Sequence, residues 1–257
     1  IKMVNLTIDK ENSIIFRDIV DAMLKLEIQD SNLVCDKDGI TIQTMDPSHV
    51  SLVSLVLGKE FFETYKSDER EVVGVSLINL AKILRGNQRG NRLTVKTIGD
   101  NLEIKICRDR QTSVFQIPCL DIEETSVNIS EVAYDNRYQI PANLFQRSIQ
   151  DLLLLEGTSC QLTWNESTIA LSSRGHLGQT SLTMDTITVK TREELRLNSS
   201  EIKKVKGVTV PIRDYCCVEK FTRPVQANFS LNYLQHFVQS NKLSPNQVCW
   251  QVSESFL

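Results

Sequence analysis

GITIQTMDPSHVSLVSLVL, residues Gly39 to Leu57, is the stretch from which the fold is predicted. Apolar residues recur at Ile40 and Ile42 before a central break, and at four positions after it: Val50, Leu52, Leu55 and Leu57. Alternation of apolar and polar residues is typical of a strand with one buried face. Asp46-Pro47-Ser48, between the two runs, is typical of a tight polar turn. The stretch therefore predicts a β-hairpin.

The middle of this hairpin carries a recognisable signature. Met45 to Leu52 (MDPSHVSL) resembles the MDxSHVSL motif of the proliferating cell nuclear antigen family, the eukaryotic-type DNA sliding clamps. Three further segments resemble the family in the same order: residues 61–83 (FFETYKSDEREVVGVSLINLAKI), 171–178 (LSSRGHLG) and 229–237 (FSLNYLQHF). Four collinear matches are more specific than any single motif. The resemblance implies an α+β DNA-clamp fold with helices lining a central hole and sheets outside.

Periodicity along the chain predicts four repeats of one strand-and-helix unit. Apolar spacing predicts helices over residues 16–26, 72–86, 142–155 and 231–240, with Ser13 as a candidate cap of the first. Grouped in pairs, the repeats predict two similar domains, each of two strand-helix-three-strand repeats. The expected boundaries are 1–118 for the N-terminal domain, 119–136 for a connecting loop and 137–257 for the C-terminal domain.

Two departures from the family are expected in the second domain. Residues 186–224 form a long insertion, which we interpret as a solvated surface loop, with an accessory contact as the alternative. The sequence ends at Leu257, where the family continues through further strands, so these last strands are expected to be absent.

Composition is that of an ordinary globular protein. The chain has 257 residues, 41% hydrophobic and 24% charged, with a formal net charge of −3. No apolar run has membrane-spanning length and no signal-peptide pattern precedes the first strand, which predicts an intracellular protein. Seven cysteines without a CxxC pair indicate reduced thiols rather than disulfides or zinc ligands. The resemblance implies nuclear localisation, or a viral replication site if the protein is viral.

Basic residues gather where the overall charge is negative. Residues 74–99 contain five Lys or Arg residues and no acid. Lys82 and Arg85 lie three apart on the predicted second helix and so share a face. The resemblance implies that the helices face duplex DNA through five residues: Arg17, Lys25, Lys82, Arg85 and Arg147. Asp18, Gln150 and Asn232 occupy positions where the family usually has a base, which predicts a weaker grip there. No base-reading motif is present, so sequence-independent binding is expected.

The predicted connecting loop is acidic and interspersed with apolar residues. It contains five acids and no base. The resemblance implies that the loop and the hairpin together form an apolar pocket for short partner peptides. The implied lining residues are Met45, His49, Leu52, Val127 and Ile129. The implied partners are DNA polymerase, the clamp loader, flap nuclease and ligase.

Ring closure is the remaining implication of the resemblance. A homotrimer would close by head-to-tail pairing of edge strands, for which the candidates are Thr112–Ile117 and Gly178–Met184. The expected interface side chains are Val114, Phe115, Ile117, Leu182 and Met184. A checkpoint-type hetero-ring subunit and a non-encircling interaction scaffold remain alternatives.

An enzymatic function finds little support in the sequence. His49, His176 and His236 lie far apart and match no metal-ligand spacing. Asp46 near His49 is more simply interpreted as the turn residue than as an acid–base partner. We therefore expect no catalytic residue, no metal and no cofactor.

Overall fold

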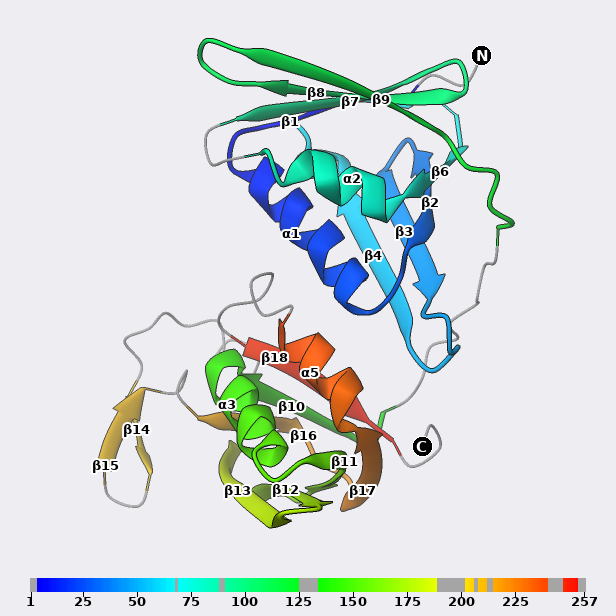
Figure 1. Cartoon of the computed structure of the whole chain (residues 1–257). Coiled ribbons are helices and arrows are strands. Elements are labelled where there is room, and N and C mark those ends of the chain that lie inside the picture. Colours follow the sequence, from blue (N-terminus) through cyan, green and yellow to red (C-terminus); the bar gives the residue numbers. More distant parts are fainter. Residues whose placement is uncertain are drawn as a thin grey trace. The chain divides into compact units, whose positions relative to one another are not determined.

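The computed structural model divides the chain into two compact units, residues 1–128 and 129–257. The structure describes residues 4–67, 69–87, 91–124, 134–188, 202–205, 208–211, 215–239 and 247–253, and each unit is treated separately below. The mixture of sheets and helices confirms the predicted α+β clamp fold (Figure 1).

The first unit contains two helices and nine strands among its described residues. In chain order these are β1 (Asn5–Ile8), α1 (Asn12–Lys25), β2 (Asp30–Asp36), β3 (Gly39–Met45), β4 (Leu52–Gly58), a 3₁₀ turn (Lys59–Phe61), β5 (Thr64–Lys66), β6 (Glu71–Ser76), α2 (Leu77–Leu84), β7 (Arg92–Ile98), β8 (Asn101–Cys107) and β9 (Thr112–Pro118). One sheet has the order β5-β1-β7-β8-β9 and the other β4-β3-β2-β6. The two repeats are interlocked, because each contributes its first strand to the sheet of the other.

A single core fills the space between the helices and both sheets. Phe16, Ile19 and Met23 on α1 belong to the same buried cluster as Leu80 on α2 and Ile104 on β8. Their helical and alternate-strand spacing is the pattern that the sequence showed. The other faces of both sheets point away from the helices.

Two local predictions for the first unit were wrong. The second helix spans Leu77–Leu84 rather than residues 72–86, because the β-branched residues before it form β6 and pair with β2. Ser13 does not cap α1: the carboxylate of Asp9 accepts hydrogen bonds from the backbone N–H groups of Glu11 and Asn12, both at 2.8 Å. The hydroxyl of Ser13 instead donates to the Asn91 carbonyl at 2.9 Å.

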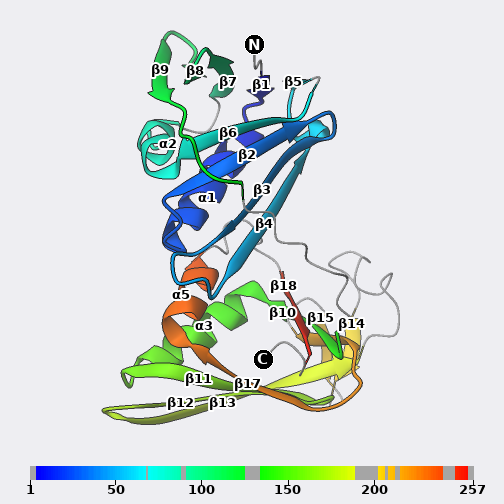
Figure 2. The ribbon, with the colours of Figure 1, turned by 90° about the vertical axis from the view of Figure 1, so that its right-hand side faces the viewer.

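The second unit repeats this interlocked arrangement. Its elements are β10 (Asn136–Pro141), α3 (Ala142–Leu153), β11 (Gly157–Trp164), β12 (Thr168–Gly175), β13 (Gly178–Thr188), β14 (Ile202–Val205), β15 (Val208–Pro211), β16 (Cys216–Lys220), β17 (Val225–Ser230), α5 (Leu231–Gln239) and β18 (Gln247–Val252). Strands β17-β11-β12-β13 correspond in order to β6-β2-β3-β4, and β16-β10-β18 correspond to β5-β1-β7. Figure 2 shows α3 and α5 on the same side of these strands.

The surface-loop interpretation of residues 186–224 was wrong for its last part. Cys216, Cys217 and Val218 are each 1% exposed or less, and β16 lies between β13 and β10 in the seven-stranded sheet. It pairs antiparallel with β10, as β5 pairs with β1. Strand β16 is therefore a core element of the unit. Earlier in the same range, β14 and β15 form a separate two-stranded hairpin.

Candidate nucleic-acid interface and partner surface

Two predicted DNA-facing residues lie exposed on or beside α2. Leu77, Leu80 and Leu84 fix this helix by burying one side of it, each at 1% exposure or less. Lys82 and Arg85 are exposed, and neither makes a hydrogen bond or ion pair within the described residues. Both cations are available for phosphate contacts, which need no particular base sequence.

The predicted DNA-facing residues of α1 are less accessible. The guanidinium of Arg17 forms an ion pair with Asp18 at 2.8 Å and donates to the Asn87 carbonyl at 3.2 Å. Its side chain is only 27% exposed. Arg17 therefore fastens the segment after α2 to the first helix, besides adding positive charge. Lys25 lies in the last turn of α1 and is partly buried.

Much of the charge after α2 is neutralised. Arg92 pairs at 2.6 Å with Glu63, the residue before β5, and Lys96 pairs at 2.9 Å with Glu103 on the neighbouring strand β8. Hydrogen bonds from Gln116 and Lys96 lower the pKa of Glu103. The basic stretch seen in the sequence is thus divided: Lys82 and Arg85 have no ion-pair partner in the part of the chain that the structure describes, whereas Arg92 and Lys96 on β7 are paired with acids. Arg89 lies outside the described residues.

The helices of the second unit carry one predicted contact. Arg147 is exposed on α3 and has no hydrogen bond or ion pair among the described residues. Gln150 and Asn232 are also exposed but neutral. Phe145 on α3 and Leu234 on α5 are buried in the core. Their burial determines which face of each helix remains accessible.

A buried carboxylate shapes the turn between β3 and β4. Asp46 is 2% exposed, and its carboxylate accepts hydrogen bonds from the backbone N–H groups of Ser48, Val50 and Ser51. This confirms Asp46 as the turn-forming residue. His49 adopts a left-handed backbone conformation (φ 56°) and is exposed. Met45 and Leu52 are directly opposite each other across the hairpin and half-buried.

Residues 120–124 lie on the same outer sheet face as Met45 and Leu52. The Leu120 N–H donates to the Gly74 carbonyl at 2.9 Å, and the Asn32 amide donates to the Ile122 carbonyl at 3.1 Å. A Cβ on Gly74 would lie 2.2 Å from the Leu120 carbonyl oxygen, so only glycine permits this approach. Arg70 and Glu124 complete the attachment with an ion pair. Val127 and Ile129 lie outside the described residues.

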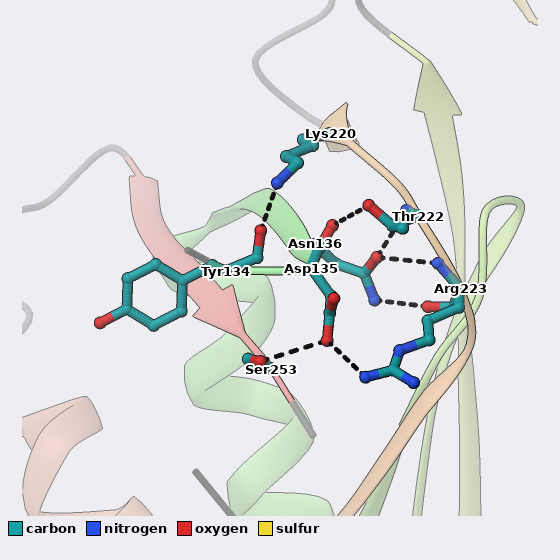
Figure 3. A network of polar contacts seen from close by, with 7 residues as sticks. All are labelled: Tyr134, Asp135, Asn136, Lys220, Thr222, Arg223 and Ser253. Carbon is teal, nitrogen blue, oxygen red and sulfur yellow. Dashed lines mark hydrogen bonds and ion pairs between the residues drawn. The ribbon is translucent and has the colours of Figure 1, made fainter. Parts of the chain in front are cut away.

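The second unit holds the other end of the connecting segment through a polar network (Figure 3). The fully buried Asn136 amide donates to the Arg223 carbonyl at 2.7 Å and accepts from the Thr222 N–H at 2.9 Å. Asp135 accepts from Arg223 at 3.2 Å and from the Ser253 hydroxyl at 3.1 Å, and Lys220 donates to the Tyr134 carbonyl. These contacts fix residues 134–136 against the β16–β17 turn and the residue after β18.

Each unit presents a strand with an unpaired edge among the described residues. β9 pairs only with β8, and its Val114 and Phe115 are 54% and 37% exposed, whereas Ile117 packs partly against the core. Residues 178–185 of β13 pair only with β12. Leu182 packs against its own core, and Met184 is 7% exposed with its Sδ 4.0 Å from Cys216 Sγ. Any contribution of Met184 to an interface would come from its backbone.

Comparison with known proteins identifies the family. A family model described as "Proliferating cell nuclear antigen, N-terminal domain" matches residues 3–129. The chain is 30% identical over 238 residues to Proliferating cell nuclear antigen of Chaetomium thermophilum, covering 91% of this chain and 83% of that protein. This chain belongs to the proliferating cell nuclear antigen family. It is also 27% identical over 223 residues to Proliferating cell nuclear antigen of Dictyostelium discoideum, covering 85% of this chain and 79% of the relative.

Membership of the proliferating cell nuclear antigen family makes this chain a DNA sliding clamp, a processivity factor of DNA replication and repair. The family acts as a clamp and not through catalysis. No helix among the described residues is long and apolar enough to span a membrane.

Sequence reasoning missed two exposed apolar residues in and near the β12–β13 turn. Leu154, after α3, and Leu177, in the β12–β13 turn, are 70% and 66% exposed. A Cβ on Gly175 would lie 1.9 Å from the Leu155 carbonyl oxygen, so this turn packs closely against the segment after α3. The only sequence signal was the run of four leucines at 152–155, which a helix cannot bury entirely on one face.

Proposed function

We propose that three copies of this chain close into a ring around duplex DNA in the nucleus and act without catalysing a reaction. The observation that carries this proposal is the pair of open edges, β9 in the first unit and residues 178–185 of β13 in the second. An unpaired edge is a template for strand addition, and a heterologous contact between two different edges generates a ring when its rotation closes. Val114 and Phe115 on β9, and Leu177 directly before β13, supply exposed apolar area at the two edges.

Solution mass tests ring closure. Light scattering at micromolar concentration should give three chain masses, without growth at higher concentration. Val114→Lys and Leu177→Lys should each lower the mass to one chain, because a lysine beside the edge must be desolvated when strands pair. Val56→Lys is the matched control, since Val56 is 69% exposed on another edge strand, β4. A monomeric wild type, or dissociation by all three substitutions alike, would contradict the proposed edges.

Encirclement predicts retention that depends on DNA topology. A ring threaded on duplex DNA with both ends blocked should stay bound in moderate salt and leave once one end is cut. Equal dissociation rates from blocked and cut DNA would refute encirclement, because a protein that does not surround the duplex has no need of a free DNA end.

We further propose that the outer face around Met45 and Leu52 binds short partner peptides, with His49, Val127 and Ile129 completing the pocket. Support comes from the attachment of residues 120–124 to this same sheet face. The proposed ligands are hydrophobic and aromatic anchor residues of DNA polymerase, the clamp loader, flap nuclease and ligase. Met45→Ala with Leu52→Ala should weaken binding of an anchor peptide at least tenfold and leave the mass of the ring unchanged. Equal peptide affinity in wild type and variant would refute the pocket.

A further inference from the structure

A single guanidinium joins the end of α2 to the start of the edge strand β9. Arg108 is the first residue of the β8–β9 turn, which is closed by a hydrogen bond from the Arg108 N–H to the Gln111 carbonyl at 2.8 Å. The Arg108 side chain donates from Nη2 to the Gly86 carbonyl at 3.0 Å and from Nη1 to the Ser113 hydroxyl at 3.1 Å. Arg108 therefore bridges two elements that lie far apart in the sequence.

The Gly86 carbonyl lies just beyond the C-terminus of α2, where the helix dipole is negative. A guanidinium at this end of a helix is electrostatically favourable. Gly86 directly follows Arg85, one of the two exposed cations on or beside α2. The hydrogen bond from Arg108 to Gly86 therefore restrains the backbone that carries Arg85.

The same segment is held from its other side by α1. The Asn87 carbonyl accepts a hydrogen bond from Arg17 at 3.2 Å, and the Asn87 side-chain amide donates to the Ser13 carbonyl at 3.2 Å. Asn87 is fully buried. Residues 86–87 are thus held between α1 and the β8–β9 turn, and Arg108 extends this chain of contacts to β9.

Ser113 lies on the open edge proposed for ring closure. It is the second residue of β9 and directly precedes Val114, which is 54% exposed. Its backbone pairs with Ile106 on β8. Pairing of β9 with a strand of another copy would further restrict the backbone at Ser113 and, through the Ser113 hydroxyl, the position of the Arg108 guanidinium.

We propose that Arg108 is a positioning residue that couples strand pairing at β9 to phosphate binding at the end of α2. This inference rests on the proposed ring and on the predicted DNA contacts of Lys82 and Arg85. A paired β9 holds the Arg108 side chain, which in turn holds the backbone beside Arg85, so less conformational freedom is lost when DNA binds. Because coupling between two binding events is reciprocal, phosphate bound at α2 also favours the paired state of β9.

Substitutions that conserve charge separate this coupling from simple electrostatic attraction. Arg108→Lys keeps the positive charge, but an ammonium group lacks the planar fork that reaches two acceptors at fixed positions. Ser113→Ala removes the neutral acceptor on β9. The matched controls are Arg110→Lys in the same turn and Ser54→Ala on the edge strand β4. Both control side chains are exposed and form no hydrogen bond or ion pair within the described residues.

Fluorescence anisotropy over a salt series measures DNA affinity, at protein concentrations where each variant has a mass of three chains. Arg108→Lys and Ser113→Ala should each weaken binding of random-sequence duplex about threefold at 0.1 M salt, with an unchanged salt slope, because no phosphate contact is lost. The double variant should lose no more affinity than Arg108→Lys alone, because both substitutions break the same link. Both controls should bind like wild type. On dilution, the Arg108→Lys ring should dissociate at an about threefold higher concentration than the wild-type ring.

Wild-type DNA affinity in Ser113→Ala would overturn the proposal, because a purely local role in the turn leaves the end of α2 unaffected. Losses that add in the double variant would also overturn it, since they would show two independent effects. Failure of wild type to form a trimer would instead refute the proposed ring. Unchanged DNA affinity in Lys82→Glu with Arg85→Glu would refute the predicted DNA contacts of α2.

Discussion

The helices of the two units have the same place in the fold but differ in charge. α1 and α2 pack against the sheets of the first unit as α3 and α5 do in the second, and each pair is fixed by buried apolar residues. Residues 12–25 and 77–85 carry four basic residues against two acidic ones, a net charge of +2. Residues 142–153 and 231–239 carry Arg147 and Asp151 and no other Lys, Arg, Asp or Glu, a net charge of zero.

This difference in charge predicts that the two units contribute unequally to DNA binding. Affinity for DNA phosphates rises with each cation placed beside the duplex. The fold depends instead on buried apolar residues, whose spacing is similar in the two units. We therefore expect the first unit to provide most of the DNA contacts and the second to complete the ring with little attraction of its own. Weak total attraction suits a clamp that must move along DNA.

The largest expected effect comes from removing the unpaired cations of the first unit. Lys82→Glu with Arg85→Glu should weaken binding to random-sequence duplex about 50-fold at 0.1 M salt and lower the salt slope by about two, since two phosphate contacts are lost. Fluorescence anisotropy over a salt series measures both quantities.

Lys66→Glu with Lys105→Glu is the matched control for this reversal, because both lysines are exposed on the same unit's five-stranded sheet, on the face away from the helices. Equal losses in the two variants would show that net charge, and not the helix face, determines affinity.

A second variant should remove the difference in helix charge between the two units. Gln150→Arg with Asn232→Arg adds two cations at exposed positions of α3 and α5. DNA affinity should rise about tenfold at 0.1 M salt, with a steeper salt dependence, because flexible exposed side chains capture only part of the maximal gain. Unchanged affinity in the same anisotropy series would mean that these helix faces do not approach the duplex.

The sequence was sufficient for features with strong local patterns. The β3–β4 hairpin, the buried sides of α1 and α3, and the strand β18 at Gln247–Val252 follow directly from periodicity. Asp46 was correctly interpreted as a turn residue because a carboxylate next to proline is suited to bind the following backbone N–H groups. Local chemistry determines each of these features.

Features that depend on distant partners could not be predicted in this way. β16 has only five residues and is held by β10 and β13, which lie far from it in the sequence. The ion pairs of Arg92 and Lys96 could not be predicted, because Glu63 comes from a segment 29 residues earlier and Glu103 is placed opposite Lys96 by the β7–β8 register. The sequence also gave no sign that Met184 is buried against Cys216.

Substitution of Arg17 should have a smaller effect on DNA affinity and tests whether this residue also stabilises the first unit. Arg17→Ala removes an ion pair with Asp18 and a hydrogen bond to the Asn87 carbonyl, so the unfolding free energy should fall by about 1 kcal/mol. DNA affinity should fall about threefold, less than for Lys82 and Arg85, because the guanidinium is largely committed within the protein.

Denaturant unfolding and DNA anisotropy, measured on the same sample, separate the two roles of Arg17. Arg147→Ala is its counterpart in the second unit and should reduce DNA affinity with little effect on stability, since Arg147 is exposed and has no partner among the described residues. Equal stability losses in the two variants would contradict the role of Arg17 in attaching the segment after α2 to α1.

The smallest expected effect tests whether the cores of the two units bury a cysteine thiol equally well. Burial raises the pKa of the Cys35 thiol in β2 and of the Cys216 thiol in β16 to about 12, from an ordinary value of 9.0. Each thiol stays protonated in the folded state while it ionises in the unfolded chain, so stability that is fully present below pH 9 is lost as pH rises toward 12. At pH 9 the loss should be about 0.4 kcal/mol per thiol, because half of the unfolded thiols are ionised.

Cys35→Ala and Cys216→Ala isolate these two contributions. Each substitution changes packing equally at all pH values, so the stability difference from wild type should shrink by the same small amount between pH 7 and pH 9 in both variants. Hydrogen exchange of β2 and β16 in increasing urea reports the two units separately. Equal shifts would indicate that the units differ in helix charge and not in their interiors. A shift at Cys35 alone would mean that β16 opens to solvent more readily than its burial implies, and that the second unit is the less rigid part of the clamp.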